Sequence, residues 1–481
     1  MLFNSLEFIV FFLIFFFSYW FIFNKNIKLQ NLLILCSSYF FYAWWDWRFL
    51  ILIIISSFTD YLIGIQIENL KNKIYKKRAL ILSLFVNLGI LLVFKYYNFF
   101  IDNFKIVLEK MNLQTNPDLI NIILPIGISF YTFQTLSYTI DVYNNKISAH
   151  RDSISFFAFV AFFPQLVAGP IERAKNLLPQ FLIKRKFNYD FAISGCKLIL
   201  IGLFKKMVIA DNISLIVDPI YSNPNDFLGF PTLLATIFFA FQIYCDFSGY
   251  SDIAIGLARL LGFKLMTNFN TPYFSKSLTD FWRNWHISLS TWFKDYVYIP
   301  LGGNRISKKK MHLNILITFL LSGFWHGANW TFLIWGAIHG FGLIIEKNFS
   351  FKIKNNFISD SLRIFSTFSI VCLAWIFFRS ETLSDSILIF NNLFVDILDY
   401  TNYEIMSLKF RGIGLKPIDL IKCVLFIILL IFIELSSKSK KIMNIFNSNK
   451  FIRYSGYYFI LILIIFWGTR FSGNNFIYFQ F

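Results

Sequence analysis

Two histidines lie within one apolar, aromatic stretch of the sequence, GFWHGANWTFLIWGAIHG at residues 323–340. They are His326 and His339, and the whole chain contains only five histidines. An ionisable side chain inside an apolar segment is costly and usually has a function. A neutral imidazole suits such a place because it exchanges a proton near neutral pH without holding a permanent charge. The pattern favours a catalytic or proton-relay role for His326, whereas close helix packing explains His339 better.

A third histidine lies in a stretch that mixes charged and aromatic residues, DFWRNWHISLSTWFKDYVYIPLGGNR at 280–305. We interpret this stretch as helical, which would place Trp282, His286 and Ser290 on one face because they lie four residues apart. The mixture of charge and aromatic rings indicates a segment that lines a polar cavity or lies at a membrane interface. Taken alone, His286 is explained at least as well by a structural hydrogen bond.

The sequence lacks the patterns of a metal site or a disulfide framework. No H-E-x-x-H motif is present, and carboxylates with ligand spacing are missing. The five cysteines occur singly, without a C-x-x-C pair. We therefore predict no metal site and interpret the cysteines as small apolar packing residues.

Apolar helices must position these side chains. Hydrophobic residues make up 57% of the 481-residue chain, charged residues make up 15%, and 64 residues are Phe. Such a composition predicts an all-α polytopic membrane protein. We expect roughly a dozen tilted transmembrane and re-entrant helical elements. They are centred on the apolar runs at 8–23, 31–45, 49–66, 80–103, 119–143, 153–169, 195–216, 230–247, 251–263, 312–346, 361–379, 384–397, 418–435 and 455–470.

The formal net charge of +18 arises from 45 basic and 27 acidic residues. The basic residues gather mainly in short loops such as 71–78, 184–186 and 308–310. That distribution is typical of cytoplasmic loops and argues against a nucleic-acid partner. Because Lys25 and Lys28 follow the first apolar run, we expect this run to cross the bilayer, with the N-terminus outside and the two lysines in the cytoplasm. No cleavage pattern accompanies the run, so we interpret it as a retained span.

Five stretches together resemble the signature of the membrane-bound O-acyltransferase family. They are the two histidine-bearing stretches and LPIGISFYTFQTLSYTIDVY (124–143), FFPQLVAGPIERAKNLLPQF (162–181) and YCDFSGYSDIAIGLARLLGF (244–263). The chain resembles most closely the bacterial branch of alginate and peptidoglycan O-acetylation proteins. The resemblance implies one membrane domain over 1–481 in which tilted helices surround a central tunnel. We divide it into N-terminal helices (1–118), a motif-bearing catalytic core (119–346) and C-terminal helices (347–481).

The resemblance also implies site residues. His326 in the WHG element would be the essential histidine, and His286 in the WHxS element a second functional one. Acyl transfer needs a base for the acceptor hydroxyl and stabilisation of the oxyanion. We expect His326 to take the proton, and His286 or a nearby donor to orient the carbonyl. The candidate tunnel-lining residues are Trp325, Asn329, Trp330, Trp282, Ser290 and Asp246, and the candidates for the phosphates of coenzyme A are Arg305 and Lys308.

The resemblance implies that an acetyl group from cytoplasmic acetyl-CoA crosses the bacterial inner membrane and O-acetylates a cell-envelope polysaccharide. The polymer would be an alginate-like exopolysaccharide or peptidoglycan, and the partner an extracytoplasmic serine-type acyltransferase. D-alanyl transfer to teichoic acid is the main alternative enzyme activity. A membrane transporter or flippase and a non-catalytic scaffold are two further alternatives.

Overall fold

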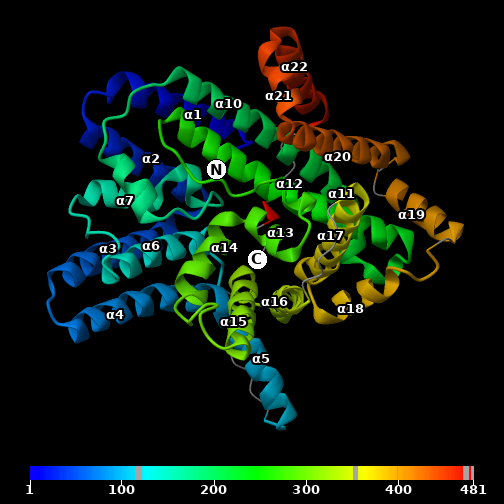
Figure 1. The fold of residues 1–481 in the computed structure, drawn as a ribbon, viewed down its shortest axis with the longest axis horizontal. Helices are drawn as coiled ribbons and strands as arrows, with labels where there is room; N and C mark the ends of the chain where they lie inside the picture. The colour runs from blue at the N-terminus through cyan, green and yellow to red at the C-terminus, as the bar shows by residue number, and fades with distance from the viewer. Residues whose placement is uncertain are drawn as a thin grey trace. The chain divides into compact units, whose positions relative to one another are not determined.

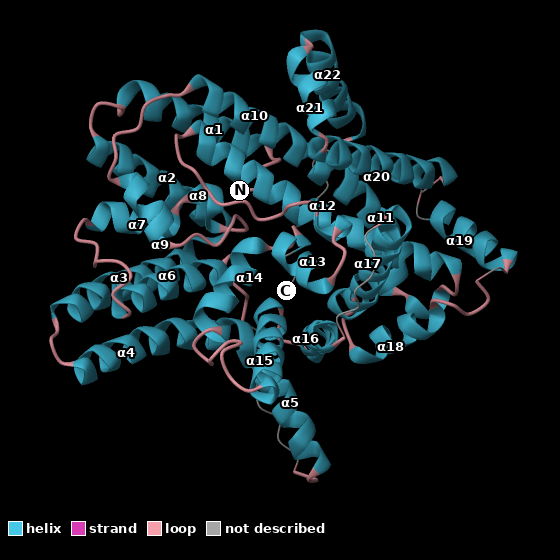
Figure 2. Cartoon of the chain, viewed as in Figure 1, coloured by secondary structure: helices cyan, strands magenta, loops and turns pink. Residues whose placement is uncertain are grey.

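The computed structural model of the chain describes residues 1–113, 122–349, 356–397, 399–412, 414, 416–469 and 476–477. Within these ranges the chain contains helices and no strand (Figure 2). The predicted all-α fold is confirmed. The division of the chain into three parts stays a prediction, and its boundary at 118–119 lies outside the described residues.

The chain forms two compact units. The first consists of residues 1–196 and 254–266, and the second of residues 197–253 and 267–481. Two helices, α10 (Tyr189–Leu203) and α12 (Phe230–Leu260), contribute residues to both units. The two predicted catalytic histidines, His286 and His326, and also His339 belong to the second unit.

A buried polar network joins the long helices of the first unit. Asp60 on α3 is fully buried and accepts hydrogen bonds from Ser83 and Asn87 on α4. Since buried polar groups must find partners, this network fixes how α3 and α4 meet, and α6 packs beside both (Figure 1). The helices of this unit are α1 (Leu6–Phe17), α2 (Ile27–Asp46), α3 (Leu50–Asn69), α4 (Lys73–Leu91), α5 (Tyr97–Lys110), α6 (Ile128–Tyr143), α7 (Ser153–Ala161), α8 (Phe163–Leu166) and α9 (Ala174–Leu177).

The second unit holds the histidine-bearing helices, of which α15 and α16 pack most extensively against each other. Besides parts of α10 and α12, this unit contains α11 (Asp211–Ser222), α13 (Leu278–Asn284), α14 (Ile287–Phe293), α15 (Lys308–His326), α16 (Trp330–Asn348), α17 (Phe357–Arg379), α18 (Leu383–Asn392), α19 (Tyr400–Gly412), α20 (Pro417–Lys438), α21 (Lys440–Ser448) and α22 (Lys450–Trp467). Two π-helical turns, η5 (Phe204–Ala210) and η8 (Lys294–Tyr298), continue α10 and α14.

Five helical stretches of the described chain are long and apolar enough to cross a membrane. They are Ile27–Asn69, Lys73–Lys110, Phe230–Leu260, Phe357–Arg379 and Lys450–Trp467. These stretches agree with the predicted polytopic character of the chain.

Three of the predicted apolar runs differ from the observed helices. The runs at 230–247 and 251–263 form the single helix α12, because Gly249 between them stays helical. A Cβ at Gly249 would lie 2.7 Å from the carbonyl oxygen of Gly202, so this glycine allows a close approach of α10 and does not end a helix. Conversely, the run at 312–346 contains two helices, α15 and α16, separated at residues 327–329.

Candidate active site

Glycines let α15 and α16 cross closely at the site. A Cβ at Gly323 would lie 2.2 Å from the carbonyl oxygen of Phe332, and one at Gly336 would lie 2.3 Å from that of Phe319. No side chain fits such gaps, so the two backbones touch. The crossing occurs one turn before His326, the last residue of α15, and thereby brings His326 against the aromatic face of α16.

His326 is buried, with 3% of its surface exposed, inside a shell of aromatic rings. Its ring centroid lies 4.9 Å from that of Trp325, 5.1 Å from that of Trp335 and 5.3 Å from that of Phe378. The ring of His286 lies 6.4 Å away between centroids. The structure therefore brings together the two histidines that the sequence predicted, together with Trp325.

The prediction of one helix through Trp282, His286 and Ser290 is wrong. Helix α13 ends at Asn284, Trp285 is extended, and His286 adopts a left-handed conformation with φ of 41° before α14 begins. This conformation is unusual for a residue with a side chain and costs about 1–2 kcal/mol. The surroundings must hold it, and such strain is common at functional sites.

Asn268 holds the turn at His286, and the sequence analysis missed this residue. Its backbone carbonyl accepts a hydrogen bond from the amide of Ile287 at 2.9 Å. Its side-chain Oδ1 lies 3.1 Å from Nδ1 of His286 and accepts from Oγ of Ser288 at 2.9 Å. Asn268 thus satisfies amide groups at the start of α14, which have no partner within their own helix. A single asparagine in a loop carries no periodic signal that would have identified it.

His339 lies on the same face of α16 as Trp335. Nδ1 of His339 accepts a hydrogen bond from the indole nitrogen of Trp282 at 3.3 Å. The ring of Trp335 lies 5.1 Å from that of His339 and 5.1 Å from that of His326, between centroids. Close packing, predicted for His339, is accompanied here by a defined hydrogen bond to a candidate tunnel-lining residue.

A cavity of about 980 Å³ opens beside the histidines in the second unit. Three of the predicted residues, Trp282, Ser290 and Arg305, line it. Its wall also includes Ile287, the neighbour of His286, and Ser322, which lies one turn before His326. The histidines themselves, Trp325 and Lys308 are not part of its lining.

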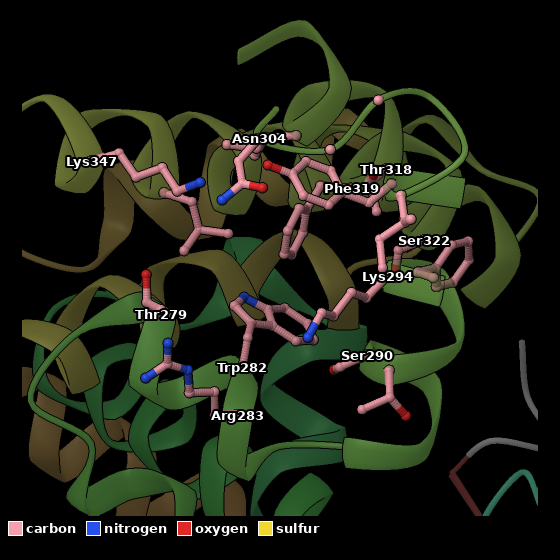
Figure 3. Close-up of a pocket in the computed structure, with 18 of the residues that line it drawn as sticks. Thr279, Trp282, Arg283, Ser290, Lys294, Asn304, Thr318, Phe319, Ser322 and Lys347 are labelled. Carbon is pink, nitrogen blue, oxygen red and sulfur yellow. The ribbon is translucent and has the colours of Figure 1, made fainter. Parts of the chain in front are cut away.

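The cavity wall is strongly cationic. Arg283, Lys294 and Lys347 join Arg305 in the lining, and the lining includes no Asp or Glu. Figure 3 shows Arg283, Lys294 and Lys347 around the hollow, from α13, η8 and α16 respectively. A concave wall with positive charges attracts anions, so the cavity can hold an anionic ligand.

Asn329 and Trp330, two candidate tunnel-lining residues, lie outside the cavity. The side chain of Asn329 caps α16 by accepting from the amide of Thr331 at 3.1 Å, and it donates to the carbonyl of Glu381 at 2.7 Å. Trp330 is 51% exposed. Neither residue lines the cavity.

Asp246 takes part in a buried ionic network. Its carboxylate lies 2.7 Å from Nζ of Lys206, which also lies 2.9 Å from the carboxylate of Asp211. It further accepts a hydrogen bond from the amide of Ile477 at 2.7 Å. The neighbouring Lys205 pairs with Asp252 at 2.8 Å. Two consecutive lysines within the apolar run 195–216 were the available signal for this network.

Among the residues that the structure describes, no group of three or more His, Cys, Asp or Glu side chains could hold a metal ion. The site offers two imidazole groups beside a cationic cavity. Two neighbouring imidazoles suit proton transfer to and from a hydroxyl or a thiolate.

Comparisons with known proteins agree with this interpretation. The family model of the membrane-bound O-acyltransferases matches residues 55–382. The chain is 42% identical over 385 residues to the probable alginate O-acetylase AlgI of Pseudomonas aeruginosa, covering 80% of this chain and 73% of that protein. It is 37% identical over 391 residues to the peptidoglycan O-acetyltransferase of Helicobacter pylori, covering 76% and 73% of the two chains.

A more distant relative has a different named activity. The teichoic acid D-alanyltransferase of Streptococcus thermophilus is 28% identical over 314 residues, which cover 58% of this chain and 75% of that protein. The predicted family and the predicted O-acyltransferase activity are both confirmed. This chain is a multi-pass membrane protein that belongs to the membrane-bound O-acyltransferase family.

Proposed function

We propose that this protein takes an acetyl group from cytoplasmic acetyl-CoA and passes it across the membrane for O-acetylation of a cell-envelope polysaccharide. The acceptor polymer is an alginate-like exopolysaccharide or peptidoglycan. The observation that carries the proposal is the pairing of His286 and His326, 6.4 Å apart, beside a cationic cavity in a member of this family. The relatives named for O-acetylation are 37–43% identical to this chain, against 28–29% for those named for D-alanyl transfer.

In the proposed reaction, the acceptor hydroxyl attacks the thioester carbonyl and its proton passes to a ring nitrogen of His326. The carbon–sulfur bond then breaks, and the thiolate of coenzyme A leaves with the proton that His326 held. The aromatic shell around His326 excludes water, which would otherwise hydrolyse the thioester. A positioned base of this kind contributes about 10²–10⁴-fold to the rate.

The cationic cavity is the proposed donor site. Arg283, Lys294, Arg305 and Lys347 line it, and they supply the charge needed for the phosphates of coenzyme A. Lys308 lies at the start of α15, outside the lining, and can add to the field around the opening. The lining also reaches Ile287 and Ser322, next to the two histidines, so a bound thioester would extend toward them.

The direction of transfer follows from the expected orientation. Its basic residues place the stretch at 305–310 on the cytoplasmic side of a bacterial inner membrane by the positive-inside rule, and acetyl-CoA is available on that side. The acceptor hydroxyl enters from the outer side and belongs to an extracytoplasmic serine-type acyltransferase, which passes the acetyl group on to the polymer.

Release of ester-bound acetate from the envelope by mild base tests the proposal. Three strains are compared that carry the wild-type protein, His326→Ala or no protein, with membrane levels matched by immunoblot. Ester acetate should disappear in His326→Ala and in the strain without protein, and the polymer fraction that loses it identifies the acceptor. Wild-type acetate in His326→Ala would overturn the role of His326, and loss of ester-linked D-alanine would point to D-alanyl transfer instead.

A further inference from the structure

We infer that Asn268 is a positioning residue that fixes the proton of His286 on Nδ1, so that His286 serves the acyl-transfer site as a hydrogen-bond acceptor. This inference rests on the proposed function and assigns His286 to the proton side of the reaction, together with His326. It departs from the expectation that His286 orients the carbonyl, because a neutral His286 in this state has no N–H on its other nitrogen.

The orientation of the Asn268 amide is set by its neighbours. Oδ1 lies 3.3 Å from the backbone amide of Ser288. A backbone N–H can only donate, so the atom that faces it must be the oxygen and not the nitrogen of the side chain. On the opposite side, Nδ2 of Asn268 donates to Oγ of Ser251 at 3.1 Å. All four of these groups lie on buried residues.

The tautomer of His286 follows from that orientation. Oδ1 of Asn268 lies 3.1 Å from Nδ1 of His286, and an amide oxygen only accepts. Nδ1 must therefore carry the proton, because a lone pair there would face the lone pairs of Oδ1. Oγ of Ser288 lies 3.4 Å from Nδ1 but only 2.9 Å from Oδ1, so its hydroxyl proton is directed at Asn268. The lone pair of neutral His286 is consequently on Nε2.

The backbone geometry keeps this arrangement in place. His286 has its left-handed φ of 41° while the amide of the next residue, Ile287, is bonded to the carbonyl of Asn268. The main chain and side chain of Asn268 thus hold the residue and its ring together. The ring is packed edge-on against Phe247, with 4.7 Å between centroids, and turning the ring over would take Nδ1 away from Oδ1 of Asn268.

An acceptor at Nε2 suits a partner of the base. Once His326 has taken the hydroxyl proton, its imidazolium needs an acceptor for its N–H, and it lies in the same buried cluster as His286. A separation of 6.4 Å between ring centroids leaves room for one bridging oxygen atom, from water or from the acceptor hydroxyl. In this arrangement Asn268 orients His286, and His286 in turn orients His326. Catalytic bases in other nucleophile–base pairs are likewise oriented by a third group.

Acetyl transfer in permeabilised membranes tests the inference. Membranes receive radiolabelled acetyl-CoA, and base-labile label in the envelope polymer is counted per folded protein. Asn268→Leu keeps the size of the side chain but has no acceptor, and it should lower the rate by about 10- to 100-fold. Asn268→Asp keeps an acceptor oxygen and should retain most of the activity at neutral and alkaline pH.

Two comparisons separate positioning from a merely structural role. In a His286→Ala background, Asn268→Leu should cause no further loss beyond about twofold, because the residue through which it acts is gone. Asn392→Leu is the matched control: Asn392 is also buried and donates to the carbonyls of Pro224 and Phe227, but it does not contact a histidine. It should affect abundance only. Equal losses in the wild-type and His286→Ala backgrounds would overturn the inference.

The rate–pH profile of Asn268→Asp distinguishes an acceptor from a donor. A carboxylate beside Nδ1 favours the protonated ring, which has no lone pair, so the acid limb should move to higher pH. If His286 donated to the carbonyl, this variant would instead gain activity at low pH, and the inference would fail. Absence of any label transfer by the wild-type membranes would refute the proposed function itself, which is a separate outcome.

Discussion

The indole N–H of Trp282 donates a hydrogen bond to Nδ1 of His339, with 3.3 Å between the two nitrogens. Trp282 also lines the cationic cavity, whereas His339 is fully buried behind it. One wall of the cavity is thus held by a histidine that does not itself line it. Because Nδ1 accepts this bond, neutral His339 carries its proton on Nε2.

Replacing His339 by Phe should loosen that wall. The ring remains, but the buried indole N–H loses its acceptor, which costs about 1–3 kcal/mol. We expect a lower melting temperature in detergent and a several-fold higher KM for acetyl-CoA, with kcat less affected than in His326→Ala. His339→Gln, which offers a carbonyl oxygen, should lie closer to wild type. A loss of kcat equal to that of His326→Ala, at unchanged KM, would place His339 in the chemistry instead.

The crossing of α15 and α16 should be sensitive to single methyl groups. Gly323→Ala and Gly336→Ala each place a Cβ within 2.2–2.3 Å of a carbonyl oxygen of the facing helix, so the helices must separate. Overpacking of this kind costs about 1–3 kcal/mol, and it would also move His326 away from Trp335. Gly340→Ala is the control, because the nearest atom to its Cβ would be in the flexible side chain of Leu316 at 3.3 Å, followed by Cβ of Phe319 at 3.4 Å and Cα of Leu316 at 3.5 Å.

Activity and thermal stability of the three alanine variants should be measured together. Gly323→Ala and Gly336→Ala should lose acetyl transfer and melt earlier, while Gly340→Ala should stay near wild type. If all three behave alike, the close crossing does not position His326.

Neutralising the cavity wall should weaken binding of the acetyl donor. Arg305→Gln and Lys347→Gln each remove a charge from the lining, and we expect several-fold higher KM values for acetyl-CoA with little change in kcat. Rising ionic strength should raise the wild-type KM and affect the variants less, since screening acts on the charges that remain. Lys310→Gln alters an exposed lysine of the same basic stretch that does not line the cavity. An equal effect of Lys310→Gln would indicate a general field of the loop and no defined phosphate site.

His326 could be singled out from the sequence because an ionisable residue in an apolar run stands out, and His286 through the resemblance of its WHxS element to the family. Their environment could not. The turn at His286 is imposed by Asn268, and nothing in the spacing of Trp282, His286 and Ser290 reveals a left-handed residue between two short helices. Likewise, the close approaches of Gly323 and Gly336 to the carbonyl oxygens of Phe332 and Phe319 exist only once the two helices cross.

The lengths of the helices were predicted least well, because they too depend on contacts that exist only in the folded chain. The apolar runs at 230–247 and 251–263 were expected as separate segments, yet Gly249 between them lies within the single helix α12, where it allows the backbone of Gly202 to approach closely. Local propensity is a weak guide where a tertiary contact determines the conformation.

Lys206 should be essential for the stability of the second unit. Its ammonium group lies between the carboxylates of Asp211 and Asp246, at 2.9 Å and 2.7 Å, with 8% of its side chain exposed. Lys206→Met leaves two buried carboxylates without a counter-ion, which costs about 3–5 kcal/mol. We expect a strong fall in membrane abundance and melting temperature. Lys276→Met, which breaks the more exposed pair with Asp360, should have little effect.

Substitutions within the same ionic network test whether the role of Asp246 is structural or catalytic. Asp246→Asn leaves Lys206 paired with Asp211 and retains a side-chain oxygen for the amide of Ile477. It should therefore be milder than Lys206→Met, and transfer per folded molecule should be nearly unchanged. Adding Asp246→Asn to Lys206→Met should restore part of the lost abundance, because one of the two unpaired carboxylates is removed. Abundance by immunoblot and acetyl transfer per folded molecule are the two measurements. If Asp246→Asn abolishes transfer at normal abundance, this aspartate takes part in the reaction and not only in the fold.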